Sequence, residues 1–209
     1  MDCPLCHTPE HTIIHAMQNR TLYACTHCKL VYAAPTDLLE PSDEKERYLE
    51  HENSIEHPGY VKFLMQAINE SVPYLTKGEH GLDFGCGPGP TLSLLMKQRG
   101  FTCDDYDPLF FPTRPNGLYD FIYATECFEH FYQPDNEIEY IGSLLKKQGI
   151  LIIMTEPYND TTNFARWYYA SDPTHVCFYN TETFNYISKT FSYIQLPSQN
   201  PRVTILQKK

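Results

Sequence analysis

The chain has 209 residues, which is enough to bury the core of one medium-sized α/β domain with a small appendage. With 42% hydrophobic and 20% charged residues, its composition excludes wholesale disorder. The formal net charge of −10 argues against a protein that grips nucleic acid with clustered lysines and arginines, and leaves room only for a local basic patch.

The sequence shows neither a membrane span nor a secretory leader. No apolar run approaches the roughly 20 residues that cross a bilayer. The opening stretch, MDCPLCHTPE, lacks the basic segment followed by an apolar one that marks a secretory signal. We therefore expect a cytoplasmic protein.

Cysteines are concentrated at the start of the chain, in two Cys-x2-Cys pairs: Cys3 with Cys6, and Cys25 with Cys28. The stretch 8–24 between them can form the hairpin that brings the pairs together, and four thiolates complete the tetrahedral shell of a structural Zn²⁺. His7 and His27 are alternative ligands of lower rank. The other cysteines (Cys86, Cys103, Cys127 and Cys177) are best interpreted as buried apolar thiols, since nothing in their spacing suggests a site.

Residues 1–40 form the expected zinc-ribbon module, with an exit strand at 30–35. A module this small gains most of its stability from the metal, so its role is structural or recognitive and not catalytic. Residues 41–77 are a polar linker followed by a helical pattern over 60–75, which ends near Pro73 or at the turn of Lys77 and Gly78.

Strand and helix patterns alternate over residues 78–209. We expect strands at 81–85, 101–107, 119–126 and 150–157, helices at 90–99, 137–148 and 181–191, and two C-terminal strands at 192–197 and 203–208. Gly100 and Gly149 end the first two helices and Thr181 caps the third. This alternation predicts an α/β, Rossmann-like, mostly parallel sheet with flanking helices.

A glycine loop, Leu82–Gly89 (LDFGCGPG), follows the first of these strands and opens a helix. Gly85 permits the tight turn, Gly87 lets the backbone approach a ligand, and Gly89 lets the helix pack near the strand. Pro90 suits the first turn of that helix. A second acidic position follows this helix, at the end of the next strand.

That position is Asp107, at the junction between the second strand and its loop, where a carboxylate can accept hydrogen bonds from ribose hydroxyls. Asp104 and Asp105 compete for this role, and a solvated turn acid is the alternative interpretation.

The glycine loop, the YDP stretch at 106–108 and the segment 119–157 together resemble the corresponding parts of the class I S-adenosylmethionine-dependent methyltransferases. The stretch 172–191 resembles one broad subgroup, the type 23/12-like one. The resemblance covers about residues 78–209 and implies an antiparallel C-terminal strand. The zinc ribbon accompanies several unrelated methyl acceptors in this superfamily and does not identify the substrate.

The resemblance also implies roles for particular residues. The glycine loop, including Cys86, lines the methionine and ribose part of the cofactor, and Asp83 organises it. Asp107 takes the ribose hydroxyls, and Pro108 and Leu109 lie near the adenine. Thr125 and Glu126 approach the methionine end. Glu129 and His130 are assigned a structural role, in which His130 orients the next loop.

Two departures from the family pattern matter. Only 13 positions separate Asp107 from Asp120, too few for the usual helix, strand and adenine-contacting acid. We expect a degenerate strand or none there, with the adenine held by Leu109 and Phe110. Gly81 replaces a usual apolar residue of the first strand.

His175 is the candidate general base, because the resemblance puts it above the strand ends and histidine titrates near neutral pH. The alternative is a histidine that fixes a loop. Aromatic residues after the fourth strand form either an acceptor wall or lid packing: Tyr158, Trp167, Tyr168 and Tyr169. The segment before the domain is a candidate lid over the cofactor: His51, Glu52, Asn53, His57 and Tyr60.

Three functions stay open at this point. The first is methyl transfer from S-adenosylmethionine to a small-molecule acceptor. The second is methylation of RNA or protein, with the zinc ribbon gripping the macromolecule. The third is a non-enzymatic module that binds the cofactor. The acidic balance of the chain disfavours the second, and the sequence is silent on oligomeric state.

Overall fold

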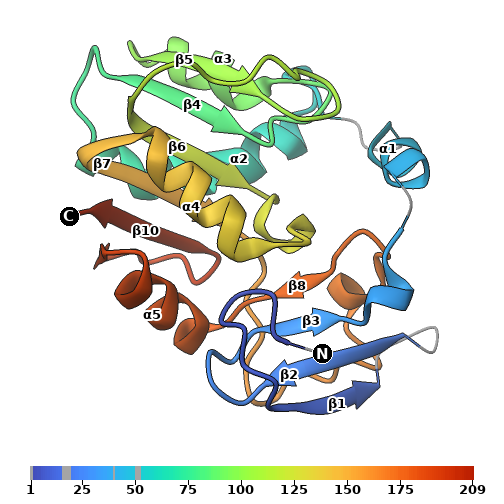
Figure 1. Ribbon diagram of the computed structural model, residues 1–209. Helices are drawn as coiled ribbons and strands as arrows, with labels where there is room; N and C mark the ends of the chain where they lie inside the picture. The colour runs from blue at the N-terminus through green and yellow to red at the C-terminus, as the bar shows by residue number, and fades with distance from the viewer. Residues whose placement is uncertain (1, 16–19, 40, 50–52) are drawn as a thin grey trace.

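The computed structural model describes residues 2–15, 20–39, 41–49 and 53–209. Over these residues the chain forms a four-stranded sheet, built mainly from the N-terminal segment, and a six-stranded sheet with helices on both faces (Figure 1). No described helix has the length and apolar character needed to cross a membrane.

The smaller sheet has the order β1-β2-β3-β8 and antiparallel pairing throughout. Its strands are β1 (His11–His15), β2 (Thr21–Cys25), β3 (Val31–Ala33) and β8 (Cys177–Phe178). The hairpin expected between the two cysteine pairs is therefore confirmed as β1 and β2, and the exit strand as β3.

The N-terminal sheet is continuous with the rest of the molecule. Its last strand, β8, comes from a distant part of the chain, with Val31 paired to Phe178 and Tyr32 to Cys177. Leu22 and Leu30 are buried in the same hydrophobic cluster as Phe131 and other residues of the larger domain. Strands β2 and β3 thus share a sheet and a core with residues far along the chain.

Two helices connect the sheets. α1 (Pro41–Leu49) is short and polar, and α2 (Pro58–Ser71) begins with a proline in its first turn, where the missing N–H costs nothing. The helix predicted at 60–75 therefore starts two residues earlier and ends at Ser71. A 3₁₀ turn, Val72–Tyr74, follows it because Pro73 lacks the N–H that would continue the α-helix.

The larger sheet has the order β5-β4-β6-β7-β10-β9. Its strands are β4 (His80–Phe84), β5 (Thr102–Tyr106), β6 (Tyr119–Thr125), β7 (Leu145–Met154), β9 (Tyr193–Leu196) and β10 (Val203–Lys208). The first four are parallel, and β10 is antiparallel to both β7 and β9. The mostly parallel sheet with an antiparallel C-terminal strand is confirmed.

Helices cover both faces of this sheet (Figure 1). α2 and α3 (Thr91–Lys97) bury residues such as Leu64 and Leu92 in one cluster. α4 (Pro134–Leu144) and α5 (Thr181–Thr190) bury Ile138 and Ile187 in the other, which continues into the N-terminal sheet. Three short 3₁₀ turns, Pro35–Asp37, Phe128–His130 and Tyr168–Ser171, complete the described elements.

Several boundaries differ from the sequence predictions. α4 ends at Leu144 and β7 begins at Leu145, because the leucine adopts extended backbone and Lys146 pairs with Asp120 at 2.7 Å on the neighbouring strand. The cap of α5 is Asn180 and not Thr181, since its Oδ1 accepts from the Thr183 N–H at 2.8 Å. Pro90 is the N-cap of α3 and lies before its first turn.

Both departures from the family pattern have structural counterparts. No strand is found between residues 107 and 118, all of which are described, apart from one bridge between Asp107 and Phe111, so β5 is the edge of the sheet. At Gly81, an added Cβ would lie 1.9 Å from a ring carbon of Phe121. Gly81 is thus the space into which the β6 phenyl ring packs.

Candidate active site

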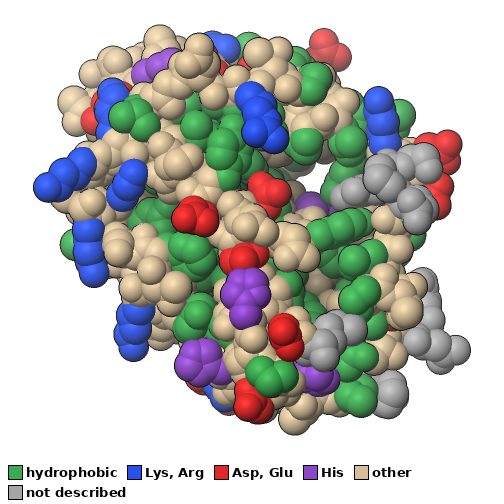
Figure 2. Space-filling view, in the orientation of Figure 1, with side chains coloured by type: hydrophobic (Ala, Val, Ile, Leu, Met, Phe, Trp, Pro, Cys, Tyr) green, Lys and Arg blue, Asp and Glu red, His purple; other side chains and the backbone are tan. Residues whose placement is uncertain are grey.

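A cavity of about 960 Å³ lies at the carboxyl ends of β4, β5 and β6, the edge where parallel sheets bind ligands. Residues of the glycine loop and of the 3₁₀ turn at 168–171 line it, and Arg47 and Tyr48 of α1 close one side. In Figure 2 the surface is hollowed beside α1. The cavity is at the upper end of ligand-pocket sizes, so it can hold more than one small molecule.

The glycine loop forms the floor of this cavity. Gly85 and Gly87 both have left-handed backbone, with φ of +78° and +64°, where a side chain is strained. A Cβ on Gly85 would also lie 2.5 Å from the Cys127 sulfur. The Gly85 N–H donates to the Tyr106 carbonyl at 2.8 Å, which ties the loop to the end of β5.

Gly89 lies beneath a segment that lines one side of this cavity. A Cβ there would lie 1.9 Å from the Asn53 carbonyl oxygen, and Asn53 lines the cavity. We expect Gly89→Ala to displace this segment and to weaken, about tenfold, the binding of S-adenosylhomocysteine, the product form of the cofactor that the sequence resemblance implies; calorimetry measures it. Gly117→Ala is the matched control, because a Cβ at Gly117 meets nothing within 4 Å. Equal affinity in both variants would contradict the prediction.

Asp107 joins the loop to the cavity wall. Its side chain is 8% exposed, and its Oδ2 accepts from the Gly87 N–H at 3.0 Å. Its Oδ1 accepts from the N–H groups of Leu109 and Phe110 at 2.8 and 3.1 Å. A carboxylate has about four acceptor positions, so these three bonds leave capacity for one hydroxyl.

The other acids of these strands differ from Asp107 in position. Asp104 and Asp105 do not line the cavity, and Phe110 is outside its lining although Leu109 is part of it. Asp83 is fully buried at the end of β4, and its Oδ1 has no hydrogen-bond partner among the described residues. Burial, with the charges of Asp105 and Asp107, holds the pKa of Asp83 well above its usual range. Of these four acids, Asp107 alone lines the cavity.

Glu126 occupies strained backbone directly after β6. Its φ is +47°, which is uncommon for a residue with a side chain and is typical of functional positions. Burial and the nearby charge of Glu129 raise the pKa of Glu126 to about 9, against the opposing effect of Arg202. The residue lines the cavity, and its Oε1 has no hydrogen-bond partner within the described part of the chain.

Glu126→Gln is expected to stabilise the fold at neutral pH. Because the pKa of Glu126 is higher in the folded protein than in the unfolded chain, the wild-type free energy of unfolding is highest below about pH 4.5. It falls as pH rises from there to about 9. The neutral amide removes that loss, so the free energy of unfolding at pH 8 should increase by about 1–2 kcal/mol. Urea unfolding at pH 5 and pH 8, without added divalent ions, measures it. A gain at pH 5 equal to that at pH 8 would contradict the assignment.

Two histidines lie side by side in the lining of the cavity. The rings of His130 and His175 lie 4.9 Å apart at 73°, and each Nδ1 is held by a backbone carbonyl, Thr174 O at 2.9 Å and Tyr169 O at 2.7 Å. Burial lowers the pKa of His175 to about 4, although the charge of Glu129 opposes this. The His175 imidazole is therefore neutral at pH 7.

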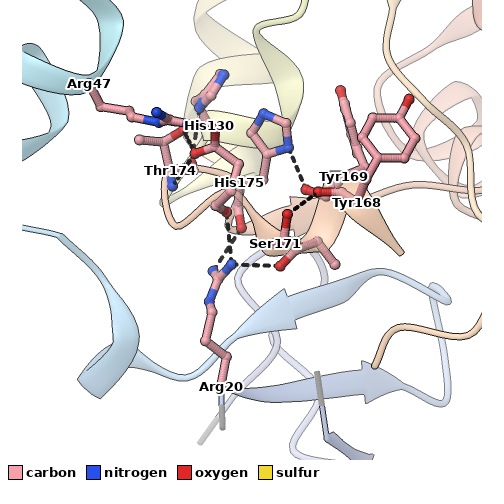
Figure 3. A network of polar contacts seen from close by, with 10 residues as sticks. Arg20, Arg47, His130, Tyr168, Tyr169, Ser171, Thr174 and His175 are labelled. Atoms are coloured by element: carbon pink, nitrogen blue, oxygen red, sulfur yellow. Dashed lines mark hydrogen bonds and ion pairs between the residues drawn. The ribbon is translucent and has the colours of Figure 1, made fainter. Parts of the chain in front are cut away.

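Arg20, which sequence reasoning counted only as a base, connects the N-terminal sheet to this site. The residue is 7% exposed, and its guanidinium donates to the carbonyls of Ala170, Asp172 and His175 at 3.1, 2.8 and 2.8 Å (Figure 3). On the α1 side, Arg47 pairs with the Asp172 carboxylate at 3.0 Å. The segment that carries His175 is thus held between the two N-terminal elements.

The four N-terminal cysteines converge at one point. Their sulfurs lie within 4.8 Å of one another, with Cys3 to Cys28 at 3.5 Å and Cys6 to Cys25 at 3.4 Å. Ligand sulfurs about 2.3 Å from a tetrahedral Zn²⁺ are about 3.8 Å apart, so this spacing fits such an ion and is far from a disulfide. His7 and Lys29, directly after each pair, share left-handed backbone, with φ of +56° and +63°, so the two cysteine turns are alike.

The chain matches a family model described as a methyltransferase domain over residues 48–191, more than half of its length. The chain belongs to the class I S-adenosylmethionine-dependent methyltransferases. A search of the curated proteins gives no significant match to this methyltransferase.

Solved structures share the fold of this methyltransferase at low identity. Magnesium protoporphyrin IX methyltransferase from Synechocystis PCC 6803 is 12% identical, with a TM-score of 0.54 and coverage of 81% of this chain and 92% of that one. The 1,6-didemethyltoxoflavin-N1-methyltransferase of Burkholderia thailandensis is 12% identical, with a TM-score of 0.52 and coverage of 94% of this chain and 99% of that one. The N-methyltransferase NodS of Bradyrhizobium japonicum WM9 is 17% identical, with a TM-score of 0.50 and coverage of 79% of this chain and 97% of that one. The calicheamicin methyltransferase CalO1 is longer, and this chain spans 55% of it.

Most residues singled out in the sequence line one cavity in this methyltransferase: Gly85, Cys86, Gly87, Asp107, Pro108, Leu109, Thr125, Glu126 and His175. Asp83 and Gly89 lie outside its lining. Of the aromatic segment, Tyr168 and Tyr169 line the cavity, whereas Tyr158 and Trp167 pack on the hydrophobic core. Asn53 and Tyr60 of the expected lid line the cavity, His57 is the N-cap of α2, and His51 and Glu52 lie outside the described residues.

Proposed function

We propose that this methyltransferase transfers the methyl group of S-adenosylmethionine to a small-molecule acceptor inside the 960 Å³ cavity. The layout of the cavity supports this proposal. The cavity joins the glycine loop and Asp107 at one end to Tyr169, His130 and His175 at the other, so cofactor and acceptor sites share one continuous cavity. In this proposal residues 41–77 are the linker and lid of a methyltransferase domain over residues 78–209.

The residues present fit this cofactor. Backbone of Gly85, Cys86 and Gly87 would hold its methionine and ribose portion, with Gly89 allowing the close approach of Asn53. The remaining acceptor position of Asp107 would take a ribose hydroxyl, and Pro108 and Leu109 would contact the adenine. Asp83, with its unpartnered oxygen, would organise the loop toward the cofactor's ammonium group. Thr125 and Glu126 would lie at its methionine end.

Bound S-adenosylmethionine supplies an electrophilic methyl carbon on a positively charged sulfur. The residues of this chain align the acceptor with that carbon and exclude water, and such alignment supplies much of the rate. If the acceptor arrives protonated, His175 takes its proton at Nε2, because the imidazole is neutral at pH 7 and its Nδ1 is occupied by the Tyr169 carbonyl.

A small acceptor is favoured because side chains surround the acceptor end of the cavity, with Tyr48 of α1 against the His130 ring at 5.2 Å. Solved structures of similar fold are named for small-molecule methylation, including the toxoflavin-precursor enzyme. The net charge of −10 disfavours a nucleic acid acceptor.

We further propose that Cys3, Cys6, Cys25 and Cys28 hold a structural Zn²⁺. The ion would have no open position for water or acceptor. The convergence of four sulfurs within 4.8 Å supports this assignment. The segment 1–40 would then be a zinc-ribbon module that braces the active site through Arg20.

The experiment follows methyl-labelled S-adenosylmethionine into a cell extract that has been separated into small-molecule, RNA and protein fractions. We expect label in the small-molecule fraction only, and its loss with Asp107→Ala. Label in RNA or protein would support the alternative in which the zinc ribbon grips a macromolecule. Binding of the cofactor with no label in any fraction would indicate a non-enzymatic module.

A further inference from the structure

Three side chains with metal-ligating atoms meet at the acceptor end of the cavity. Glu129, His130 and His175 each bring one ligand atom within 4.8 Å of the other two. Glu129 and His130 belong to the 3₁₀ turn after β6, and His175 precedes β8. His130 and His175 line the cavity, and Glu129 is fully buried in its wall.

Both imidazoles are oriented as metal ligands are. Each Nδ1 lies within 2.9 Å of a backbone carbonyl, which accepts hydrogen bonds and does not donate them. Each Nδ1 therefore carries the hydrogen, and each Nε2 carries the lone pair. Metal-ligating histidines typically donate their second ring N–H to a carbonyl in this way, which fixes the tautomer and the ring plane.

Unpartnered carboxylate oxygens provide a second, independent observation. The Tyr169 hydroxyl lies 2.6 Å from Glu129 Oε1 and 3.2 Å from Glu126 Oε2, so the two acids share a single donor. Glu129 Oε2 and Glu126 Oε1 are buried and have no hydrogen-bond partner in the part of the chain that the structure describes. Glu129 is 0% exposed, and leaving such an oxygen unpaired is costly.

We propose that Glu129, His130 and His175 bind one divalent transition-metal ion, beside Glu126, which shares the Tyr169 hydroxyl with Glu129. Two imidazole nitrogens and carboxylate oxygens with open positions suit Mn²⁺, Fe²⁺, Co²⁺ or Zn²⁺. The Glu129 carboxylate would offset part of the charge of the ion. No lysine or arginine among the described residues lies at ion-pair distance from Glu129, so the ion would supply the positive charge that this buried carboxylate lacks.

The role of this ion in methyl transfer rests on the proposed function. The ion would hold an acceptor oxygen, so the acceptor class becomes a hydroxyl or enol compound. The acceptor loses its O–H proton to solvent, the oxygen lone pair forms the bond to the methyl carbon, and the carbon–sulfur pair remains on sulfur as S-adenosylhomocysteine leaves. The His175 lone pair then serves as a ligand and not as a base.

The test is a titration of the zinc-loaded, full-length protein with Mn²⁺, followed by electron paramagnetic resonance. Mn²⁺ favours oxygen and nitrogen ligands, so the four-thiolate site retains zinc. We expect one saturable site per chain with nitrogen couplings from two imidazoles. Glu129→Gln and His175→Ala should each weaken Mn²⁺ binding at least about tenfold. The control His80→Ala, at an exposed imidazole paired with Asp104, should leave it unchanged.

Titration of S-adenosylhomocysteine into the same samples separates the outcomes. Loss of Mn²⁺ in both variants with retained nucleoside binding supports the metal site and excludes unfolding as the cause. Wild-type protein that binds the nucleoside but shows no saturable Mn²⁺, or shows Mn²⁺ without nitrogen coupling, overturns the metal site alone. Absence of nucleoside binding in the wild type, whatever Mn²⁺ does, overturns the proposed function.

Discussion

Cys25→Ser is expected to eliminate bound zinc and to unfold the N-terminal sheet. The sulfur of Cys25 lies 3.4 Å from that of Cys6, and its loss leaves three ligands around an ion that requires four. Structural zinc contributes about 10–16 kcal/mol to such modules, which equals or exceeds the stability of a whole domain. Because β3 pairs with β8, the damage should spread to the segment before the last helix. We expect zinc content to fall from one per chain to none, with a melting temperature lower by more than about 10 °C.

Cys103→Ser is the matched control for this prediction. Cys103 is equally buried, at 2% exposed, but it belongs to the hydrophobic cluster on the opposite face of the large sheet. Its replacement should cost about 1–2 kcal/mol and should leave zinc content at one per chain. Retention of zinc and melting temperature in Cys25→Ser would contradict the metal assignment.

Arg20→Met is expected to loosen the segment that carries His175 while leaving the cofactor end intact. The substitution removes three hydrogen bonds, one to the buried Ala170 carbonyl and two to the half-buried carbonyls of Asp172 and His175. Unpaired buried acceptors cost about 1–3 kcal/mol each before relaxation, so amide hydrogen exchange over residues 170–176 should speed up at least about tenfold. Methyl transfer should fall by a similar factor, with S-adenosylhomocysteine affinity within about threefold of the wild type.

Arg20→Lys distinguishes positioning from general stability. A lysine keeps the charge but cannot reproduce the planar fork that reaches three carbonyls, so it should restore melting temperature more than turnover. A proportional loss of melting temperature, nucleoside affinity and turnover in Arg20→Met would instead mean that Arg20 only stabilises the fold.

The features that the sequence predicted correctly are those encoded within a short stretch. The loop of Gly85 and Gly87 needs left-handed backbone at both positions, and the surrounding strand and helix patterns identify it. The spacing of the cysteine pairs similarly predicts the hairpin of β1 and β2. The short interval between Asp107 and Asp120 leaves no room for a third strand, and none is found there.

Contacts between distant segments could not be predicted in this way. Arg20 bonds to carbonyls in a remote part of the chain, and no local pattern marks an arginine as buried. β8 has two residues, too few for a periodic signal, yet it completes the N-terminal sheet. The end of α4 was predicted too late because Leu145 and Lys146 continue the helical pattern, while pairing with β6 makes them a strand.

The most direct test of the cofactor site is calorimetric titration of the zinc-loaded protein with S-adenosylhomocysteine, beside Asp107→Ala and Asp104→Ala. Asp107 lines the cavity, whereas Asp104 pairs with His80 on the sheet edge. Removal of charged hydrogen bonds worth about 1.5–3 kcal/mol should weaken binding about 10- to 100-fold in Asp107→Ala and leave Asp104→Ala like the wild type. Absence of binding to the wild type, or equal binding by all three proteins, would contradict the assignment of this cavity to the methyl donor.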